Sequence, residues 1–191
     1  MKVGILALQG DFIEHTHVLG QLGVESVEVR LPRDLVDLSG LIIPGGESTT
    51  IGKLAAMYNL MEPLRELAAR IPIWGTCAGM IFMAREIDRE QPLLGVMDIV
   101  VQRNAFGRQV DSFKALLDIP SLNEWSRHPY PAIFIRAPKL VAVGRDAEVL
   151  ARLKDGSAVA ARQGRWLVTA FHPELTQDDR FHRYFLSMLG E

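Results

Sequence analysis

The sequence predicts an α/β fold: a three-layer arrangement in which a mostly parallel central sheet carries helices on both faces, with a small antiparallel addition. Two observations predict it. In the first half of the chain, short apolar runs alternate with segments of helical spacing, the pattern of parallel strands joined by crossover helices. After about residue 92, short β-like runs follow one another with turn signals between them. No linker, repeat or low-complexity tract interrupts residues 1–191, so we expect a single domain.

Residues 3–43 are expected to form three strands and one helix. Residues 3–8 form a nearly continuous apolar run, as expected of a strand buried on both faces. Residues 12–22 place apolar side chains at helical spacing and end at Gly23, a common helix stop. Residues 24–31 alternate apolar and charged side chains, which predicts a more exposed strand, and residues 41–43 predict another buried strand.

The next elements lead to the only cysteine and then to the antiparallel part. A helical region is expected over about residues 50–70, with breaks near Asn59 and Pro63, followed by a short strand at residues 73–74. Residues 121–131 are expected to form a surface excursion. The remaining strands are expected at residues 95–101, 113–117, 132–135, 140–143, 149–153, 158–163 and 166–171, with a closing helix at residues 178–189.

Composition and charge limit the classes of function. The chain is 48% hydrophobic and 23% charged with a formal charge of −2, which is typical of a soluble globular protein. No basic patch with interleaved aromatic residues is present, so nucleic acid is not an expected partner. No apolar run reaches the roughly twenty residues of a membrane span. A single cysteine excludes an intramolecular disulfide, and we expect a cytoplasmic protein.

The most informative segment is Gly75-Thr76-Cys77-Ala78-Gly79, which follows an apolar run and precedes an apolar helical segment. A strand that turns sharply into a helix through small residues holds its turn residue in a strained conformation, as in the nucleophile elbow of hydrolases. The start of the following helix favours the reactive thiolate. A lone cysteine is more often a buried structural residue, but the flanking glycines favour a nucleophile.

A nucleophilic cysteine needs a base, and the base needs an acceptor that orients it. His172 follows an apolar run, and Glu174 lies two residues further on, with Pro173 between them. In an extended segment, side chains at i and i+2 point to the same side. The pattern is weak by itself, but together with the cysteine turn it predicts that His172 and Glu174 serve Cys77.

The other four histidines carry less information. His15 and His17 are two apart in a helical stretch, so their side chains diverge and metal chelation by the pair is not expected. His128 and His182 have polar neighbours and are interpreted as surface residues.

Three polar or glycine-marked segments follow apolar strands: Gln9-Gly10, residues 45–50 and residues 75–79. Ligands bind at the carboxyl ends of the strands in open parallel sheets, so the three segments should converge on one crevice. Gly45-Gly46 is, in isolation, most often a simple turn. As part of a site, its glycines let backbone N–H groups approach a substrate and form an oxyanion hole. No phosphate-binding glycine motif is present.

At this point the motifs resemble a known family. Leu8-Gln9-Gly10, PGGESTT at residues 44–50, GTCAG at residues 75–79 and FHPE at residues 171–174 resemble the triad class, class I, of glutamine amidotransferases. More narrowly, RNAFGRQVDSF at residues 103–113 and FIRAP at residues 134–138 are similar to the glutaminase subunits of pyridoxal 5′-phosphate synthase. The resemblance covers essentially the whole chain and implies a flavodoxin-like glutamine amidotransferase fold.

The resemblance implies hydrolysis of glutamine to glutamate, with the ammonia passed to a synthase. Cys77 would attack the side-chain amide, His172 would shuttle protons and Glu174 would orient it. The oxyanion hole would use Gly46 and Ala78. Implied substrate-binding residues are Gly46, Glu47, Ser48, Arg103, Ile135 and Arg136. Our hypothesis is that either arginine binds the substrate carboxylate while Glu47 helps to bind its ammonium; without the motif, each arginine is simply a solvated surface charge.

The implied partner is a (β/α)₈ synthase subunit that builds the cofactor from a pentose phosphate, a triose phosphate and the delivered ammonia, as a hetero-oligomer. Docking would complete the oxyanion hole, with Gln9 as a member of the switch. No cofactor or metal ion is expected. Three alternatives stay open: a glutaminase for another acceptor, such as imidazole glycerol phosphate synthase; another hydrolase, such as a cysteine peptidase or thioesterase; and a non-catalytic flavodoxin-like binding module.

Overall fold

The computed structural model describes residues 1–103 and 112–190. Within them, ten strands form one sheet: β1 (Lys2–Leu6), β2 (Glu25–Val29), β3 (Gly40–Ile43), β4 (Ile73–Thr76), β5 (Ala84–Ile87), β6 (Met97–Gln102), β9 (Lys139–Val143), β10 (Glu148–Arg152), β11 (Ala158–Gln163) and β12 (Trp166–Thr169). A separate antiparallel pair consists of β7 (Ser112–Leu117) and β8 (Tyr130–Ile135).

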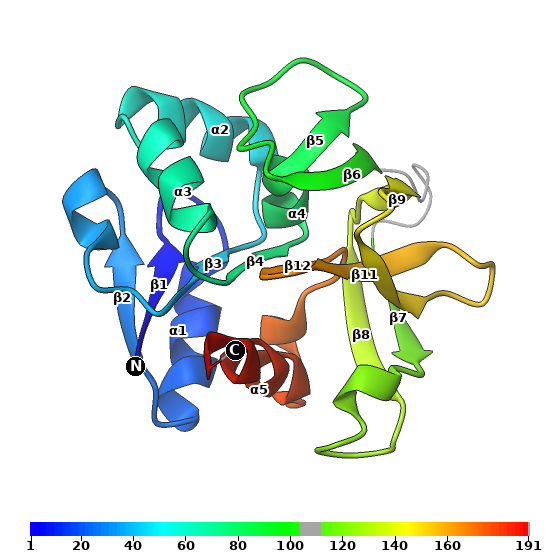
Figure 1. Cartoon of the computed structure of the whole chain (residues 1–191). Helices are drawn as coiled ribbons and strands as arrows, with labels where there is room; N and C mark the ends of the chain where they lie inside the picture. The colour runs from blue at the N-terminus through cyan, green and yellow to red at the C-terminus, as the bar shows by residue number, and fades with distance from the viewer. Residues whose placement is uncertain (104–111, 191) are drawn as a thin grey trace.

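Helices cover both faces of the parallel part of the sheet. Figure 1 shows α1 (Phe12–Gln21) and α5 (Arg180–Ser187) on one face and α2 (Ser48–Met57) and α3 (Met61–Ala68) on the other. The short helix α4 (Ala78–Met83) directly follows β4. The short 3₁₀ segments are η1 (Pro32–Leu35), η2 (Pro120–Leu122), η3 (Pro173–Leu175) and η4 (Met188–Gly190).

The strand order brings distant parts of the chain together at one sheet edge. The main sheet has the order β2-β1-β3-β4-β12-β11-β9-β6-β5, with β10 paired to β11. The five strands that are adjacent in the order β2-β1-β3-β4-β12 are all parallel, whereas β11 and β9 run antiparallel to their neighbours. The last pair in register between β4 and β12 is Thr76 with Thr169, so the chain leaves both strands at the same level, towards Cys77 and His172. The predicted fold class is confirmed.

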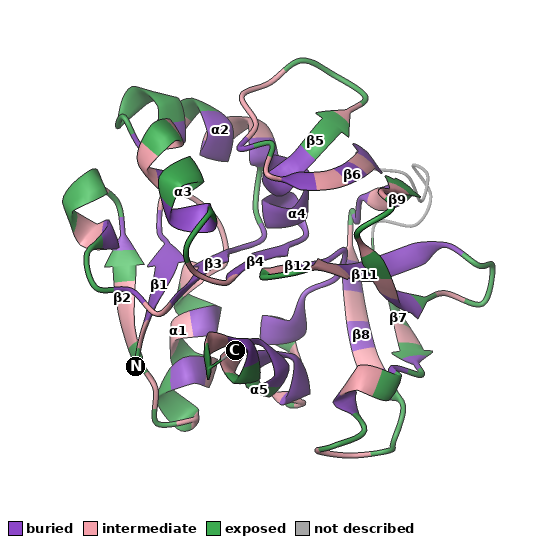
Figure 2. Cartoon of the chain, viewed as in Figure 1, coloured by how far each residue is buried: buried purple, intermediate pink, exposed green. Residues whose placement is uncertain are grey.

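The core lies on both faces of the central strands. In Figure 2, β1, β3 and β4 are buried along most of their length, as the continuous apolar runs predict. Trp74 of β4 is fully buried and packs against Phe181 and Phe185 of α5, with ring centroids 6.2 and 5.6 Å apart. Burying a side chain of this size stabilises the fold by about 1.5–3 kcal/mol, so α5 is fixed against the sheet next to the site.

Several local predictions need correction. The helical region does break at Asn59, which has a φ of 58°, but Pro63 lies inside the first turn of α3, where the missing N–H has no helical partner anyway. Strand β5 was not predicted. The excursion at residues 121–131 is only partly a surface segment, because Leu122 and Tyr130 are buried. Most of the motif at residues 103–113 lies outside the described residues.

Within the described part of the chain, no helix has both the length and the apolar character needed to cross a membrane.

Candidate active site

Cys77 occupies the sharp turn between β4 and α4. Its φ of 45° and ψ of −101° are strained for a residue with a side chain. The conformation is held by a hydrogen bond from the Cys77 N–H to the Thr169 carbonyl, 2.8 Å, in the neighbouring strand. Gly79 is required for close packing, since a Cβ there would lie 1.9 Å from the Ile43 carbonyl oxygen. The strained strand-to-helix turn predicted from the sequence is therefore present, and Cys77 is buried, with the residue 6% exposed.

His172 and Glu174 follow β12 and face each other. The His172 N–H donates to the Ile133 carbonyl of β8 at 2.8 Å, which fixes the backbone. His172 Nδ1 lies 2.6 Å from Glu174 Oε1, and both residues are buried. The contact is as predicted, but the reason is different: residues 173–175 form the 3₁₀ turn η3 and not an extended segment. The turn brings the carboxylate back to the ring, and Pro173 favours the start of that turn.

The surroundings of the imidazole favour its charged form. Burial lowers the pKa of His172, but its interactions with Asp11, Cys77 and Glu174 outweigh burial and raise the pKa to about 12. Burial raises the pKa of Glu174, and its contact with His172 opposes that shift. The ring thus interacts with a sulfur atom and with two carboxylates, as a proton shuttle beside a nucleophile requires.

Asp11 is a site residue that the sequence analysis missed. Its Oδ2 lies 3.3 Å from His172 Nδ1, and its backbone N–H donates to the Gly45 carbonyl at 3.1 Å. It directly follows the Gln9-Gly10 segment, which we did expect at the crevice. A carboxylate directly after a glycine at the end of the first strand was the signal that could have identified it.

The segments at residues 9–10 and 45–50 do meet, as predicted. The side-chain oxygen of Gln9 accepts a hydrogen bond of 2.6 Å from the Glu47 N–H. Gly46 has a φ of 146°, a conformation that favours glycine. A Cβ on Gly46 would lie 2.5 Å from Gln9 Oε1. Gln9 therefore holds the loop that carries the predicted oxyanion-hole residue Gly46.

Glu47 and Arg103 form a connected polar group at the start of α2. Glu47 accepts hydrogen bonds from the Thr49 and Thr50 N–H groups at 3.1 and 2.8 Å, and pairs with Arg103 at 3.1 Å. Burial would raise the pKa of Glu47, but the hydrogen bonds with Thr50 and Thr49 lower it to about 2. Arg103 is only 15% exposed and also donates to Gln91, at 2.9 Å. It is therefore not a solvated surface charge, and Gln91 is a further residue that the sequence analysis missed.

The remaining predicted site residues lie at the end of β8 and at the starts of α4 and α2. The Ile135 carbonyl, at the end of β8, accepts a long contact of 3.9 Å from the Cys77 thiol. Arg136 is exposed and has a strained φ of 41°. Ala78 is the first residue of α4, and Ser48 is the buried first residue of α2, with its hydroxyl 3.2 Å from Gln91 Oε1.

Two histidines that the sequence analysis set aside are buried next to the site. His182 is fully buried, so its interpretation as a surface residue was wrong; its ring packs edge-on against Trp74 with centroids 4.9 Å apart. His15 is also fully buried, and its Nε2 lies 3.4 Å from Glu174 Oε2. Helical position explains the error: His182 follows Phe181 on the side of α5 that faces the sheet. His128 is exposed, as predicted.

Comparison with known proteins decides the family. Residues 5–191 match the model of the SNO glutamine amidotransferase family. The chain belongs to this family. Its geometry agrees, since a solved structure described as a glutamine amidotransferase superposes on it with a TM-score of 0.92 at 49% identity, covering 99% of both chains. PurLQS from Thermotoga maritima, at 16% identity and a TM-score of 0.73, shares the fold.

Curated relatives of this glutamine amidotransferase family member share one name. A protein of Pelotomaculum thermopropionicum is 61% identical over 97% of this chain and 94% of its own length, and one of Herpetosiphon aurantiacus is 58% identical over 98% of this chain and 100% of its own length. Both are named pyridoxal 5′-phosphate synthase subunit PdxT.

Proposed function

We propose that the chain is a glutaminase that hydrolyses L-glutamine to L-glutamate and supplies the ammonia to the synthase subunit that makes pyridoxal 5′-phosphate. The observation that carries the proposal is that Cys77, in a strained turn, interacts with His172, whose Nδ1 lies 2.6 Å from Oε1 of the buried Glu174. The family and the names of the relatives supply the substrate class and the acceptor.

The first half of the reaction forms a thioester. His172 holds the proton of the Cys77 thiol, and the sulfur attacks the carbonyl carbon of the glutamine side-chain amide and forms a tetrahedral intermediate. The C–N bond then breaks, and His172 gives its proton to the departing nitrogen, which leaves as ammonia. Glu174 accepts a hydrogen bond from the Nδ1–H of His172, so the nitrogen that exchanges protons with sulfur and substrate is Nε2.

The second half consumes water. His172 takes a proton from a water molecule as its oxygen attacks the thioester carbon. The C–S bond breaks, the Cys77 sulfur is released and glutamate forms with the oxygen of that water. The negative charge of Glu174, with Asp11 at 3.3 Å, stabilises the imidazolium in both halves.

Backbone N–H groups of Gly46 and Ala78 are proposed to bind the oxyanion. Ala78 directly follows the nucleophile, as in other nucleophile elbows. Gly46 belongs to the loop that Gln9 holds through the Glu47 N–H. We propose that docking of the synthase subunit displaces Gln9 and lets this loop complete the oxyanion hole, which makes glutamine hydrolysis depend on the partner.

The substrate's α-amino and α-carboxylate groups need charged partners. The residues proposed to bind the substrate are Gly46, Glu47, Ser48, Arg103, Ile135 and Arg136. Of these, Glu47, Arg103 and Arg136 carry a charge. Arg103 is held in place by Glu47 and Gln91. Its guanidinium is therefore already positioned to bind the α-carboxylate of the substrate. Arg136 is exposed next to Ile135, whose carbonyl faces the thiol, and is the alternative partner for that group.

The relatives are named as subunits of the synthase, which supports a hetero-oligomer with a second, synthase subunit. We propose from the family resemblance that this subunit is a (β/α)₈ barrel. No cofactor or metal ion is needed for the steps given above. A free thiol as nucleophile suits a reducing compartment, and we place the reaction in the cytoplasm.

The test measures glutamate release from L-glutamine by the purified chain, alone and with the synthase subunit. We expect release to increase at least about tenfold with the partner, which corresponds to about 1.4 kcal/mol of transition-state stabilisation. The variant Cys77→Ser should lose the activity, and the exposed-histidine variant His128→Gln should keep it. Full ammonia release by Cys77→Ser would refute the role of the thiol, and equal turnover without the partner would refute the switch. Association with a different acceptor synthase in a pull-down would favour another pathway.

A further inference from the structure

The catalytic pair continues into the interior as a row of buried side chains that the proposed reaction steps do not use. Glu174 Oε2 faces His15 Nε2 at 3.4 Å, and His15 Nδ1 lies 3.0 Å from His182 Nε2. His15 comes from α1 and His182 from α5, so the two helices on one face of the sheet each contribute one ring. Both rings are fully buried.

Glu174 Oε2 is a buried carboxylate oxygen without a hydrogen bond of ordinary geometry among the described residues. Such an oxygen is costly unless a donor lies close. His15 Nε2 is placed for that role, although it lies equally far, 3.4 Å, from the Thr76 hydroxyl. A small movement of the ring would complete a hydrogen bond to the carboxylate.

Of the two arrangements of protons open to this row, one leaves the less costly unpartnered group. Two neutral imidazoles 3.0 Å apart share one N–H. If His15 donated from Nδ1, its Nε2 lone pair would face the Glu174 carboxylate, and the Nδ1–H of His182 would be a buried donor without a partner. If His182 donates from Nε2, His15 carries its proton on Nε2 and directs it at Glu174. The unpartnered His182 Nδ1 is then a lone pair, which is less costly to bury than an orphaned donor.

We propose that His182 and His15 form a buried, uncharged extension of the triad, in which His182 sets the tautomer of His15 and His15 positions Glu174. Glu174 then receives one N–H on each oxygen, from His172 and from His15, so its carboxylate plane is fixed relative to the catalytic ring. His15 and His182 are positioning residues, since neither touches the thiol.

Their neutrality matters for the mechanism. Burial, with the charges of His182 and His172, lowers the pKa of His15 well below its ordinary value, and burial lowers the pKa of His182 to about 3. A second charged imidazole beside Glu174 would neutralise the charge that stabilises the imidazolium of His172. A neutral donor orients the carboxylate and leaves its charge available.

The inference rests on the proposed glutaminase function and is tested with the full chain bound to the synthase subunit. His15→Met removes the donor but keeps an apolar side chain of similar reach, whereas His15→Gln keeps an N–H near the position of Nε2. We expect His15→Met to lower kcat about tenfold, the effect of one lost hydrogen bond to a charged group, with KM within about twofold. His15→Gln should stay within about threefold of wild type, and His17→Gln, an exposed control on the same helix, should match wild type.

A spectroscopic measurement separates positioning from folding and from the proposed function. In the wild-type chain labelled with ¹⁵N-histidine, NMR should show the His15 proton on Nε2 at neutral pH and Nδ1 as a hydrogen-bonded acceptor. His182→Phe removes the donor to Nδ1, so it should move the ¹⁵N shift of Nδ1 towards that of a free imidazole lone pair and lower kcat about threefold. A His15 ring protonated on Nδ1 in wild type, or equal kcat values in His15→Met and His15→Gln, would overturn the proposal. Absence of glutamine hydrolysis by the wild-type complex would refute the proposed function, and the NMR result would still decide this inference.

Discussion

One nitrogen of His172 has two carboxylates within reach. Nδ1 carries a single proton, and Glu174 Oε1 lies 2.6 Å away whereas Asp11 Oδ2 lies 3.3 Å away. The side chain of Glu174 is fully buried, and that of Asp11 is 36% exposed. Distance and burial therefore assign the hydrogen bond to Glu174, because charges attract more strongly away from water. Asp11 acts mainly through its charge, which adds to the stabilisation of the imidazolium.

Asp11→Asn should lower the raised pKa of His172. In the folded protein this pKa is about 12, above the ordinary 6.5. The stabilisation that comes with the charged ring is therefore complete below about pH 6.5 and is lost as the pH rises towards 12. Removing one negative charge should reduce the free energy of unfolding by a similar amount at pH 6 and pH 9, where the folded ring is charged, and the reduction should disappear only as the pH approaches 12.

Urea unfolding at the two pH values checks the prediction for Asp11, and a histidine NMR titration reports the pKa directly. Glu14→Gln is the matched control, because Glu14 is exposed on the same helix. An Asp11→Asn variant whose His172 pKa equals that of wild type, or whose stability is unchanged at both pH values, would contradict the prediction.

The loops after β1 and β3 act as one unit through their polar contacts. Gln9 binds the Glu47 N–H, and the Asp11 N–H binds the Gly45 carbonyl. Glu47 in turn caps the first turn of α2 by accepting from the Thr49 and Thr50 N–H groups, which have no partner within the helix. A single side chain thus stabilises the helix start and orients Arg103.

Glu47→Ala should destabilise the fold by about 1 kcal/mol at neutral pH, the usual effect of losing an N-cap. The pKa of Glu47 is lowered to about 2, so its contribution is present above the ordinary pKa of 4.5 and is lost as the pH falls towards 2. The difference in unfolding free energy between wild type and variant should therefore shrink over that interval. Chemical denaturation from pH 7 to pH 3 measures it.

Glu66→Ala is the control for the Glu47 variant, because Glu66 is exposed in the middle of α3. Its substitution should change stability by less than about 0.5 kcal/mol. A constant effect of Glu47→Ala across the pH range would show that the carboxylate is not the stabilising group.

The local sequence pattern predicted the strands and the turn that position the site residues. It predicted the contacts between these elements less well. The apolar runs of β1, β3 and β4 and the glycines around Cys77 are local signals, and the structure has the strands and the strained turn that they predict. His182 reaches the site through the packing of α5 against the sheet, and Asp11 had only the weak local signal of a carboxylate after the glycine that follows β1. The motif placed His172 beside Glu174 correctly, but the extended geometry used to explain it was wrong, because Pro173 begins a 3₁₀ turn.

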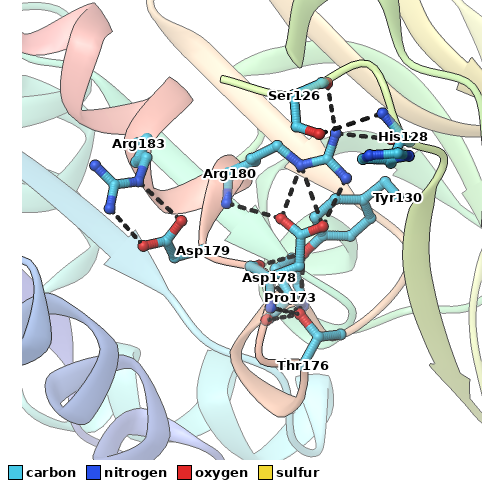
Figure 3. Close-up of polar contacts among 9 residues, drawn as sticks. All are labelled: Ser126, His128, Tyr130, Pro173, Thr176, Asp178, Asp179, Arg180 and Arg183. Carbon is cyan, nitrogen blue, oxygen red and sulfur yellow. Dashed lines mark hydrogen bonds and ion pairs between the residues drawn. The ribbon is translucent and has the colours of Figure 1, made fainter. Parts of the chain in front are cut away.

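At the scale of the whole molecule, the small sheet of β7 and β8 supplies one wall of the site. The Ile133 carbonyl of β8 fixes the His172 backbone, and the Ile135 carbonyl faces the thiol. The segment that leads into β8 is tied to α5 by Arg180, as Figure 3 shows. Arg180 donates to the Ser126 and His128 carbonyls, both at 2.8 Å, and pairs with Asp178. The closing helix thereby fixes the small sheet to the rest of the protein.

Arg180→Met should destabilise the protein by about 2–4 kcal/mol, because it removes the charged partner of the Asp178 carboxylate and leaves two carbonyls without their donor. The Arg180 side chain is 8% exposed, and its guanidinium carbon lies 5.5 Å from the centre of the Tyr130 ring, so water replaces these contacts poorly. Arg183→Met is the matched control on the same helix. Arg183 pairs with Asp179 at the surface with 45% exposure, and such a pair contributes about 0–1 kcal/mol. Thermal unfolding should give a much lower Tm for Arg180→Met than for Arg183→Met; equal Tm values would mean that Arg180 does not hold the small sheet in place.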